Sequence, residues 1–198
     1  MTFRNILRLP LSYPAARLKL LGSGWCLAIA AMVFPYDHDK HVSPDAPAAA
    51  WAVEHVGRHL NTLMQVSMPL LTRDWVGLKQ LLVVAITATA TVHGLKRLLN
   101  DVEIAGSRLG QRPRSASSKH NMPSGHSSLA ASGAWFVARR YGLIFLWILA
   151  PMTLMTMWAR VMLDAHTIWA TLAGALLGIL LTDLFTTARH KRLRPANV

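Results

Sequence analysis

The chain has 198 residues, which favours one domain, and 53% of them are hydrophobic while only 15% are charged, against roughly 25% charged residues in soluble domains. The formal net charge is +12, from 21 Lys and Arg against 9 Asp and Glu. Because these charges lie between long apolar runs and not on a basic face interleaved with aromatic residues, the composition disfavours a soluble protein and a nucleic-acid partner and favours a membrane protein.

The first long apolar run covers residues 20–36 and follows four basic residues. A cleaved signal peptide is the alternative interpretation, but the small-residue stretch at 46–50 lies too far beyond the run to be its cleavage site. We therefore predict an uncleaved first transmembrane helix. In the next segment, residues 46–71, Glu54 and Arg58 have the spacing of a pair on one helical turn. We expect a helix here that begins at the membrane interface and continues into the membrane.

Four further spans follow, and each is close to the roughly 20 residues that cross a membrane. They cover residues 81–95, 127–138, 142–159 and 168–185. The span at 127–138 is rich in small residues, and Gly174 and Gly178 form a small-residue face on the last span, as is typical of closely packed membrane helices. The predicted fold class is all-α: a single polytopic domain over residues 1–198, with about six transmembrane helices in one bundle.

The basic residues predict the orientation of this bundle, because cytoplasmic segments are enriched in Lys and Arg. With both ends inside, the segments 1–19, 71–79, 139–140 and 187–198 hold twelve Lys and Arg, and the outside loop 37–45 holds one. Residues 1–19 and 187–198 are then basic cytoplasmic tails. The second outside loop, 96–120, departs from this rule with six cations, and binding of an anion would explain them.

Three motifs fall on this outer side of the membrane. Lys96 ends the third span and precedes Arg112-Pro113 in the loop, Pro123-Ser124-Gly125-His126 opens the fourth span, and Arg160 ends the fifth, six residues before His166. Ser124 and Asp164 are good N-cap residues, so we expect His126 and His166 each to lie near the start of a helix. The free N–H groups and positive dipole of such helix ends bind phosphate.

Two histidines beside one anion site favour phosphoryl transfer with divided roles. One would attack phosphorus to give a phosphohistidine, and the other would protonate the leaving oxygen and then activate water. Lys96, Arg112 and Arg160 would hold the phosphoryl oxygens and stabilise the charge of the transition state. The sequence has no carboxylate cluster and no Cys/His set with ligand spacing, so it predicts neither a metal nor another cofactor.

These motifs resemble the type 2 phosphatidic acid phosphatase superfamily, whose signature is Lys-x6-Arg-Pro, then Pro-Ser-Gly-His, then Ser-Arg-x5-His-x3-Asp. The resemblance spans residues 96–178, where Pro123 to His126 and Arg160-x5-His166 are intact. It implies that His166 is the nucleophile and His126 the general acid, assisted by Arg160. It also implies that the phosphate is bound by four residues, Lys96, Arg112, Ser124 and Gly125.

The sequence departs from that signature at three places. Fifteen residues separate Lys96 from Arg112, so an insertion at 102–110 would have to loop out if Lys96 is to act as the motif lysine. Ala159 replaces the serine before the arginine. Ala170 replaces the aspartate that would fix the tautomer of His166, and Thr153, Thr156 or a backbone carbonyl are candidates for its role.

The sequence thus predicts a metal-independent lipid phosphatase of the bacterial inner membrane, with its active site facing the periplasm. The substrate would be a phosphorylated membrane lipid: undecaprenyl pyrophosphate, phosphatidylglycerol phosphate, phosphatidic acid or a lipid A phosphate. A lipid phosphotransferase of the same superfamily and a non-catalytic protein that binds or transports phospholipids are the alternatives. A haloperoxidase of that superfamily is disfavoured because it would be soluble.

Overall fold

The computed structural model describes residues 1–189 and is a bundle of helices with one small hairpin. Two short helices, α1 (Phe3–Leu7) and η1 (Leu9–Ser12), precede α2 (Ala15–Val33). The next helix has three parts, α3 (Ala48–Ala52), the π-helical turn η2 (Val53–Gly57) and α4 (His59–Leu71). Then come α5 (Trp75–Leu98), the strands β1 (Glu103–Ile104) and β2 (Ser107–Arg108), and α6 (Gly125–Tyr141). The turn η3 (Leu143–Phe145), α7 (Leu146–Met162) and α8 (Ile168–Phe185) complete the described chain.

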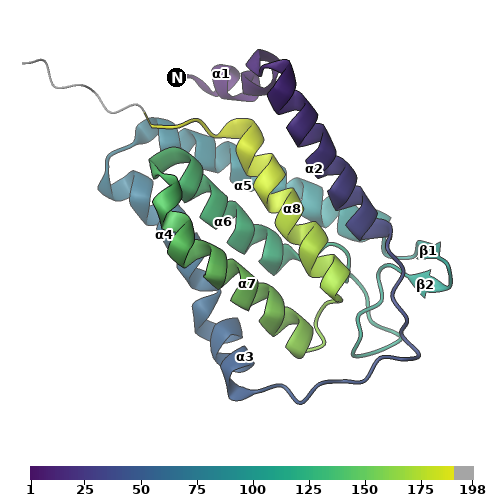
Figure 1. The fold of residues 1–198 in the computed structure, drawn as a ribbon. Helices are drawn as coiled ribbons and strands as arrows, with labels where there is room; N and C mark the ends of the chain where they lie inside the picture. Colours follow the sequence, from purple (N-terminus) through teal and green to yellow (C-terminus); the bar gives the residue numbers. More distant parts are fainter. Residues whose placement is uncertain (190–198) are drawn as a thin grey trace, which may run out of the picture.

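Helix α6 lies at the centre of the bundle and packs against α4, α5, α7 and α8, while α2 covers the outer side of α8 (Figure 1). About half of its residues are small, and most of them are buried. Small residues let helix backbones approach closely, which is how helices associate where no water is available to drive them together. The small-residue content of the predicted span at 127–138 therefore reflects a helix surrounded by other helices.

Glycines make the closest of these approaches possible. A Cβ atom added at Gly174 would lie 2.2 Å from the carbonyl oxygen of Ser124, and one added at Gly178 would lie 2.2 Å from that of Ser128. Gly133 of α6 meets the backbone of Asn61 on α4 in the same way, at 2.6 Å. The predicted small-residue face on the last span is thus the surface that packs on α6.

Four helical segments are long and apolar enough to cross a membrane, namely Ala15–Val33, Trp75–Leu98, Leu143–Met162 and Ile168–Phe185. The all-helical, polytopic part of the prediction is therefore confirmed. The two remaining predicted spans correspond to α3–η2–α4 and to α6, which contain buried polar side chains. Asn61 of α4, for example, donates to the carbonyls of Ala130 and Leu149 and to the hydroxyl of Thr153 and so links three helices.

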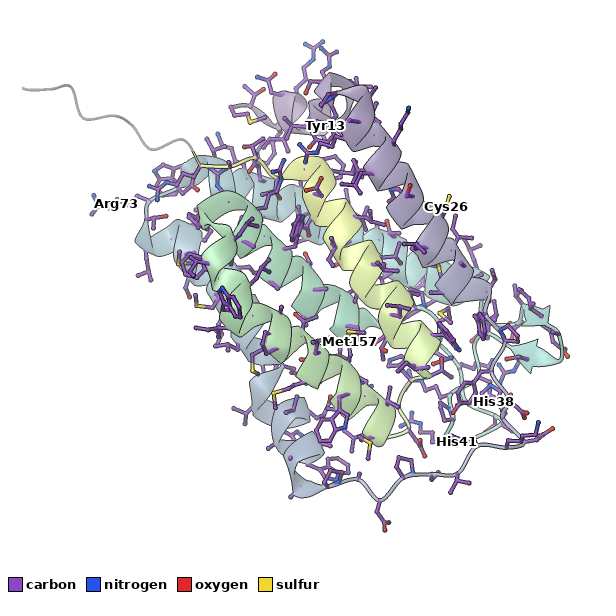
Figure 2. All side chains as sticks on the ribbon, in the orientation of Figure 1. Tyr13, Cys26, His38, His41, Arg73 and Met157 are labelled. Carbon is purple, nitrogen blue, oxygen red and sulfur yellow. The ribbon has the colours of Figure 1, made fainter. Side chains whose placement is uncertain are left out.

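The predicted basic tail at 1–19 is folded onto the bundle. Ile6 is fully buried, and the first turn of α2 is held by Arg17, whose guanidinium donates to the carboxylate of Asp183 at 2.7 Å. Of the predicted tail at 187–198, only residues 187–189 lie within the described chain. Residue 189 and the N-terminus lie at the same end of the bundle, and Arg73 is also at this end, whereas His38 and His41 lie at the other (Figures 1 and 2).

The prediction that Ser124 caps α6 is confirmed, because its hydroxyl accepts the N–H of Ser127. The corresponding prediction for Asp164 is wrong. Thr167 caps α8 by accepting the N–H of Ala170, and Asp164 lies three residues earlier with a φ of 48°. An N-cap residue needs an extended backbone, and Asp164 is instead part of the tight turn between α7 and α8.

We predict that Gly178→Ala destabilises the bundle, because its methyl group would overlap a backbone carbonyl that cannot move without shifting α6. Overpacking of this kind costs about 1–3 kcal/mol. The matched control is Gly22→Ala on α2, where an added Cβ meets nothing within 4 Å and the better helix propensity of alanine should preserve or raise stability. Thermal unfolding in detergent, followed by size-exclusion chromatography, measures both. Equal unfolding midpoints for the two variants would contradict the proposed packing constraint.

Candidate active site

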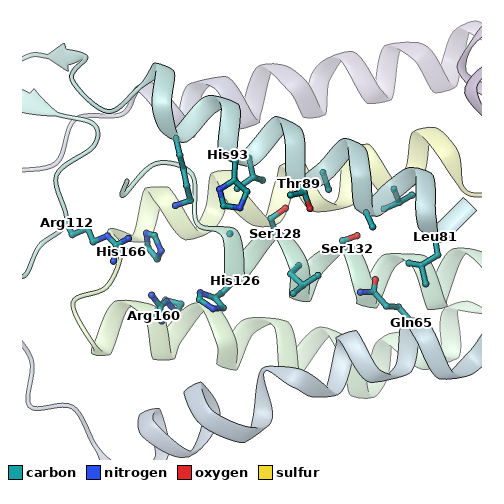
Figure 3. Close-up of a pocket in the computed structure, with 17 residues that line it drawn as sticks. Gln65, Leu81, Thr89, His93, Arg112, His126, Ser128, Ser132, Arg160 and His166 are labelled. Atoms are coloured by element: carbon teal, nitrogen blue, oxygen red, sulfur yellow. The ribbon is translucent and has the colours of Figure 1, made fainter. Parts of the chain in front are cut away.

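A cavity of about 470 Å³ opens at the end of the bundle where α5 and α7 finish and α6 begins. Its polar end holds five of the predicted site residues (Figure 3). These are, in chain order, Lys96, Arg112, His126, Arg160 and His166, with Gly125 beside them. The three sequence motifs, which are separated by up to 70 residues, therefore meet around one space.

His126 occupies the second position of α6, as the capping pattern predicts. The hydroxyl of Ser124 accepts the N–H of Ser127, and the carbonyl of Ser124 accepts that of Ser128. The N–H groups of Gly125 and His126 belong to the first turn and so point out of the helix end, and both residues line the cavity. Ser124 is fully buried and does not line the cavity. Its direct phosphate contact stays a prediction, and its visible role is to cap the helix.

His166 lies two residues before α8, with only 3% of its surface exposed. Its Nδ1 atom is 2.8 Å from the backbone carbonyl oxygen of Asn121. Since a carbonyl can only accept, Nδ1 carries the hydrogen and Nε2 keeps its lone pair. The Asn121 carbonyl thus fixes the tautomer that the family aspartate would fix, and Ala170 is fully buried in the helix beyond it.

Asn121 is itself held by the start of α8. Its side-chain oxygen accepts the N–H of Thr167 at 3.0 Å, and its side-chain nitrogen lies 3.2 Å from the Thr167 hydroxyl. Asp164 does not contact His166 through its carboxylate, which pairs with Nε2 of His41 at 2.9 Å. Sequence reasoning missed Asn121, because it lies two positions before Pro-Ser-Gly-His and its function depends on a contact with His166, 45 residues away.

Each of the three cavity cations is anchored through one of its N–H groups. Lys96 donates to the carbonyl of His120 at 2.7 Å, and Arg112 donates to that of Lys119 at 2.9 Å. Arg160 donates to the carboxylate of Glu54 at 2.6 Å. The remaining N–H groups of each cation are then available to an anion in the cavity.

The long gap between Lys96 and Arg112 is explained by a hairpin. Within the predicted insertion at 102–110, β1 pairs antiparallel with β2, and the turn between them is made by Ala105 and Gly106, both with positive φ. Two such residues form the type I′ turn that suits a two-residue hairpin loop. The insertion does loop out, and Lys96 and Arg112 line the same cavity despite it.

Two residues of the α3–α4 segment form a second layer around the cations. Glu54 accepts from both Arg58 and Arg160, at 2.7 and 2.6 Å, which confirms the predicted pair of Glu54 with Arg58. Arg58 also lies 2.8 Å from Nε2 of His126. The sequence indicated the local pair but gave no signal that it contacts Arg160 and His126, which lie on other helices.

The electrostatics of the site favour a neutral, nucleophilic imidazole. Burial lowers the pKa of His166 well below its usual value, and the positive charges of Lys96, Arg160 and Arg112 lower it further. Burial and the neighbouring charges of Arg114 and Arg160 also lower the pKa of Arg112. These cations repel one another, and an anion bound among them would relieve the repulsion.

Comparisons with known proteins agree with this geometry. A family model described as the PAP2 superfamily matches residues 77–194. A lipid A 1-phosphatase of Helicobacter pylori strain J99 is 43% identical over 152 residues, covering 76% of this chain and 77% of that protein. The lipid A 4′-phosphatase of the same strain is 32% identical, covering 73% and 74%.

One solved structure has the same fold. It is that of the first transmembrane PAP2-type phosphatidylglycerolphosphate phosphatase from Bacillus subtilis. It matches with a TM-score of 0.50 and 23% identity, and the match covers 92% of this chain and 91% of that one.

We predict that His166 titrates below pH 6.5 in the folded protein. Burial and the adjacent cations oppose the imidazolium form, so the ring should remain neutral as the pH falls through 6.5 and become charged only at lower pH. NMR titration of ¹³C-labelled histidine in detergent micelles measures this, with His166→Gln to assign the signal. In Lys96→Met the midpoint should rise, because a positive charge is removed. A midpoint at or above 6.5 in the unmodified protein would refute the electrostatic account of the site.

Proposed function

Because this chain belongs to the PAP2 superfamily, the type 2 phosphatidic acid phosphatases, and is a membrane lipid phosphatase, we propose that its substrate is lipid A and that it removes the phosphate at position 1. The similarity to known lipid A phosphatases supports this choice of substrate and position. Identity is 43% and 41% to two lipid A 1-phosphatases and 32% to a lipid A 4′-phosphatase. Of the four lipid classes compatible with the sequence, lipid A is the one that these relatives favour.

The proposed reaction begins when Nε2 of His166 attacks phosphorus. The bond between phosphorus and the lipid oxygen breaks, and His126 gives its proton to that oxygen. Lys96, Arg112 and Arg160, with the N–H groups of Gly125 and His126, hold the phosphoryl oxygens and stabilise their developing charge. The field of these groups is the basis for proposing that the reaction needs no metal.

The second half of the reaction regenerates the enzyme. Neutral His126 takes a proton from water as the water oxygen attacks phosphorus, the bond between phosphorus and Nε2 of His166 breaks, and inorganic phosphate leaves. In the described geometry Nε2 of His126 is engaged by Arg58, and a cation there opposes protonation of the ring. We infer that the lipid oxygen displaces Arg58 from His126, so that the histidine can act as an acid when substrate is bound.

The membrane arrangement that we propose has six crossings. They are α2, the continuous segment α3–η2–α4, α5, α6, α7 with η3, and α8, all within one catalytic domain whose motifs lie at 96–178. An even number of crossings puts the N-terminus and residue 189 on the same side, in agreement with their position at one end of the bundle (Figure 1). The charge distribution supports a bacterial inner membrane with these ends in the cytoplasm and the cavity facing the periplasm.

Lipid A that carries phosphates at positions 1 and 4′ tests the substrate. Purified protein in mixed micelles should release the phosphate at position 1 at least roughly tenfold faster than that at position 4′, about the ratio that 1.4 kcal/mol of transition-state discrimination gives. Mass spectrometry of the lipid product identifies the position. His166→Ala should release neither phosphate, which excludes a contaminating enzyme. Preferential release from position 4′, or release only from phosphatidylglycerol phosphate or phosphatidic acid, would refute the substrate assignment.

Single cysteines test the orientation. In a Cys26→Ala background, Ser117→Cys in the loop beside the cavity should react with a membrane-impermeant maleimide added outside intact cells. Arg73→Cys, in the turn at the opposite end, should react only after the inner membrane is permeabilised. Both side chains are exposed in the structure, so access depends on the side of the membrane. The reverse labelling pattern would overturn the proposed orientation.

A further inference from the structure

The cavity extends well beyond the phosphate-binding end. Along α5 it is lined from Lys96 back to Leu81, a stretch of fifteen residues that spans about 22 Å at the rise of an α-helix. Most residues in this extension are apolar. They are Leu81, Val84, Ala85, Ala88, Val92 and Leu129. The cavity therefore has cations at one end and, beyond them, a channel with a more apolar lining that includes some polar side chains (Figure 3), an arrangement that fits an amphiphile.

The channel is open along its side. The residues of helix α6 are buried or partly buried except Leu129, which is 47% exposed and lines the cavity. On α5, Ala85 and Thr89 line the cavity and are also exposed. These three side chains mark a gap between α5 and α6 through which a chain could pass from the surrounding lipid. An apolar occupant fits this gap, because an exposed leucine at membrane depth is stable in contact with hydrocarbon.

Five polar side chains also line this extension, namely Gln65, Thr89, His93, Ser128 and Ser132, and of these only Gln65 has a fully buried polar atom without a hydrogen-bond partner among the described residues. Gln65 of α4 lines the cavity near Leu81, at the end remote from His166 (Figure 3). Only 5% of its surface is exposed, and within the described residues its Oε1 atom has no hydrogen-bond partner. An unpaired amide oxygen in a buried site is unfavourable, because no hydrogen bond replaces those that it would make with water. A hydrogen bond from a bound molecule would remove that cost.

The position of Gln65 fixes where on a bound molecule this hydrogen bond would form. Asn61, one turn before Gln65 on α4, donates to the carbonyl of Ala130 on α6. Ala130 lies four residues after His126, and α4 and α6 run in the same direction. Gln65 therefore lies a further turn along α6, about 12 Å from His126 at the rise of an α-helix. That distance is beyond a phosphate group and within the acyl region of a lipid whose phosphate contacts the cations.

We propose that the channel binds a hydrocarbon chain of the substrate and that Oε1 of Gln65 accepts a hydrogen bond from a hydroxyl group on that chain. A hydroxyl supplies the donor that this oxygen lacks, whereas an ester carbonyl can only accept. This proposal rests on the proposed function and adds to it a determinant of acyl-chain specificity. A lipid with unsubstituted chains would occupy the channel but leave Gln65 unpaired, so the enzyme would prefer the substituted lipid.

Two synthetic lipid A analogues test the proposal. Both carry a phosphate at position 1, and they differ only in whether their acyl chains bear a hydroxyl group. The measured quantity is the ratio of kcat/KM for the hydroxylated analogue to that for the plain one. Gln65→Leu should lower this ratio roughly 3- to 10-fold, as expected from loss of one hydrogen bond, with the change mainly in KM. Because both rates come from one preparation, loss of folded protein does not alter the ratio.

Thr62→Val is the matched control. Thr62 lies on the same helix and also has a buried, unpartnered hydroxyl among the described residues, but it does not line the cavity. This substitution should leave the ratio unchanged. If Gln65→Leu lowers both rates equally, or if the unmodified protein does not distinguish the analogues, Gln65 has no role in chain recognition. If the unmodified protein hydrolyses neither analogue, it is the proposed function that fails.

Discussion

The contact between the start of α6 and the start of α8 is the constraint on which the site depends. The backbone N–H of Ser124 donates to the carbonyl of Ala170 at 2.8 Å, and Gly174 lets the two helices meet at that level. His126 follows directly from one helix start and His166 precedes the other. Their separation is therefore set by backbone packing, which does not vary with side-chain rotamers, and the phosphate end of the cavity is rigid before any ligand arrives.

The missing family aspartate shows how the same requirement is met by different chemistry. Asn121 holds the His166 ring through its backbone carbonyl and holds the start of α8 through its side chain. A neutral acceptor orients the imidazole without adding a negative charge next to the phosphate. Within the described part of the chain, Glu54 provides the only carboxylate that contacts a cation of the cavity. It pairs with Arg160 and with the neighbouring Arg58, and so reduces the repulsion between the positive charges. The negative charge of the site therefore pairs with Arg160, whereas the nucleophile His166 bonds to a neutral carbonyl.

The sequence predicted those features that depend on local pattern. The helices, the Ser124 cap, the looped-out insertion and the convergence of Lys96, Arg112 and Arg160 on the two histidines follow from hydrophobic periodicity and motif spacing. The remaining features depend on which helices are neighbours. Asp164 is of a residue type that often caps helices, but the turn between α7 and α8 places Thr167 at the N-cap position instead. The sequence predicted the pair of Glu54 with Arg58 but not the contact of Glu54 with Arg160 of α7, and it gave no signal that Gln65 lines the cavity.

The α3–α4 segment, which carries Glu54, Arg58 and Gln65, lies before residue 77, outside the segment that the family model matches. Residues 77–194 contain both histidines and the cavity cations, whereas the α3–α4 segment adds Gln65 to the cavity lining and places Glu54 behind Arg160. Under the proposal for Gln65, a substitution at this position would change which acyl chains are preferred while the residues that break the phosphate bond stay the same.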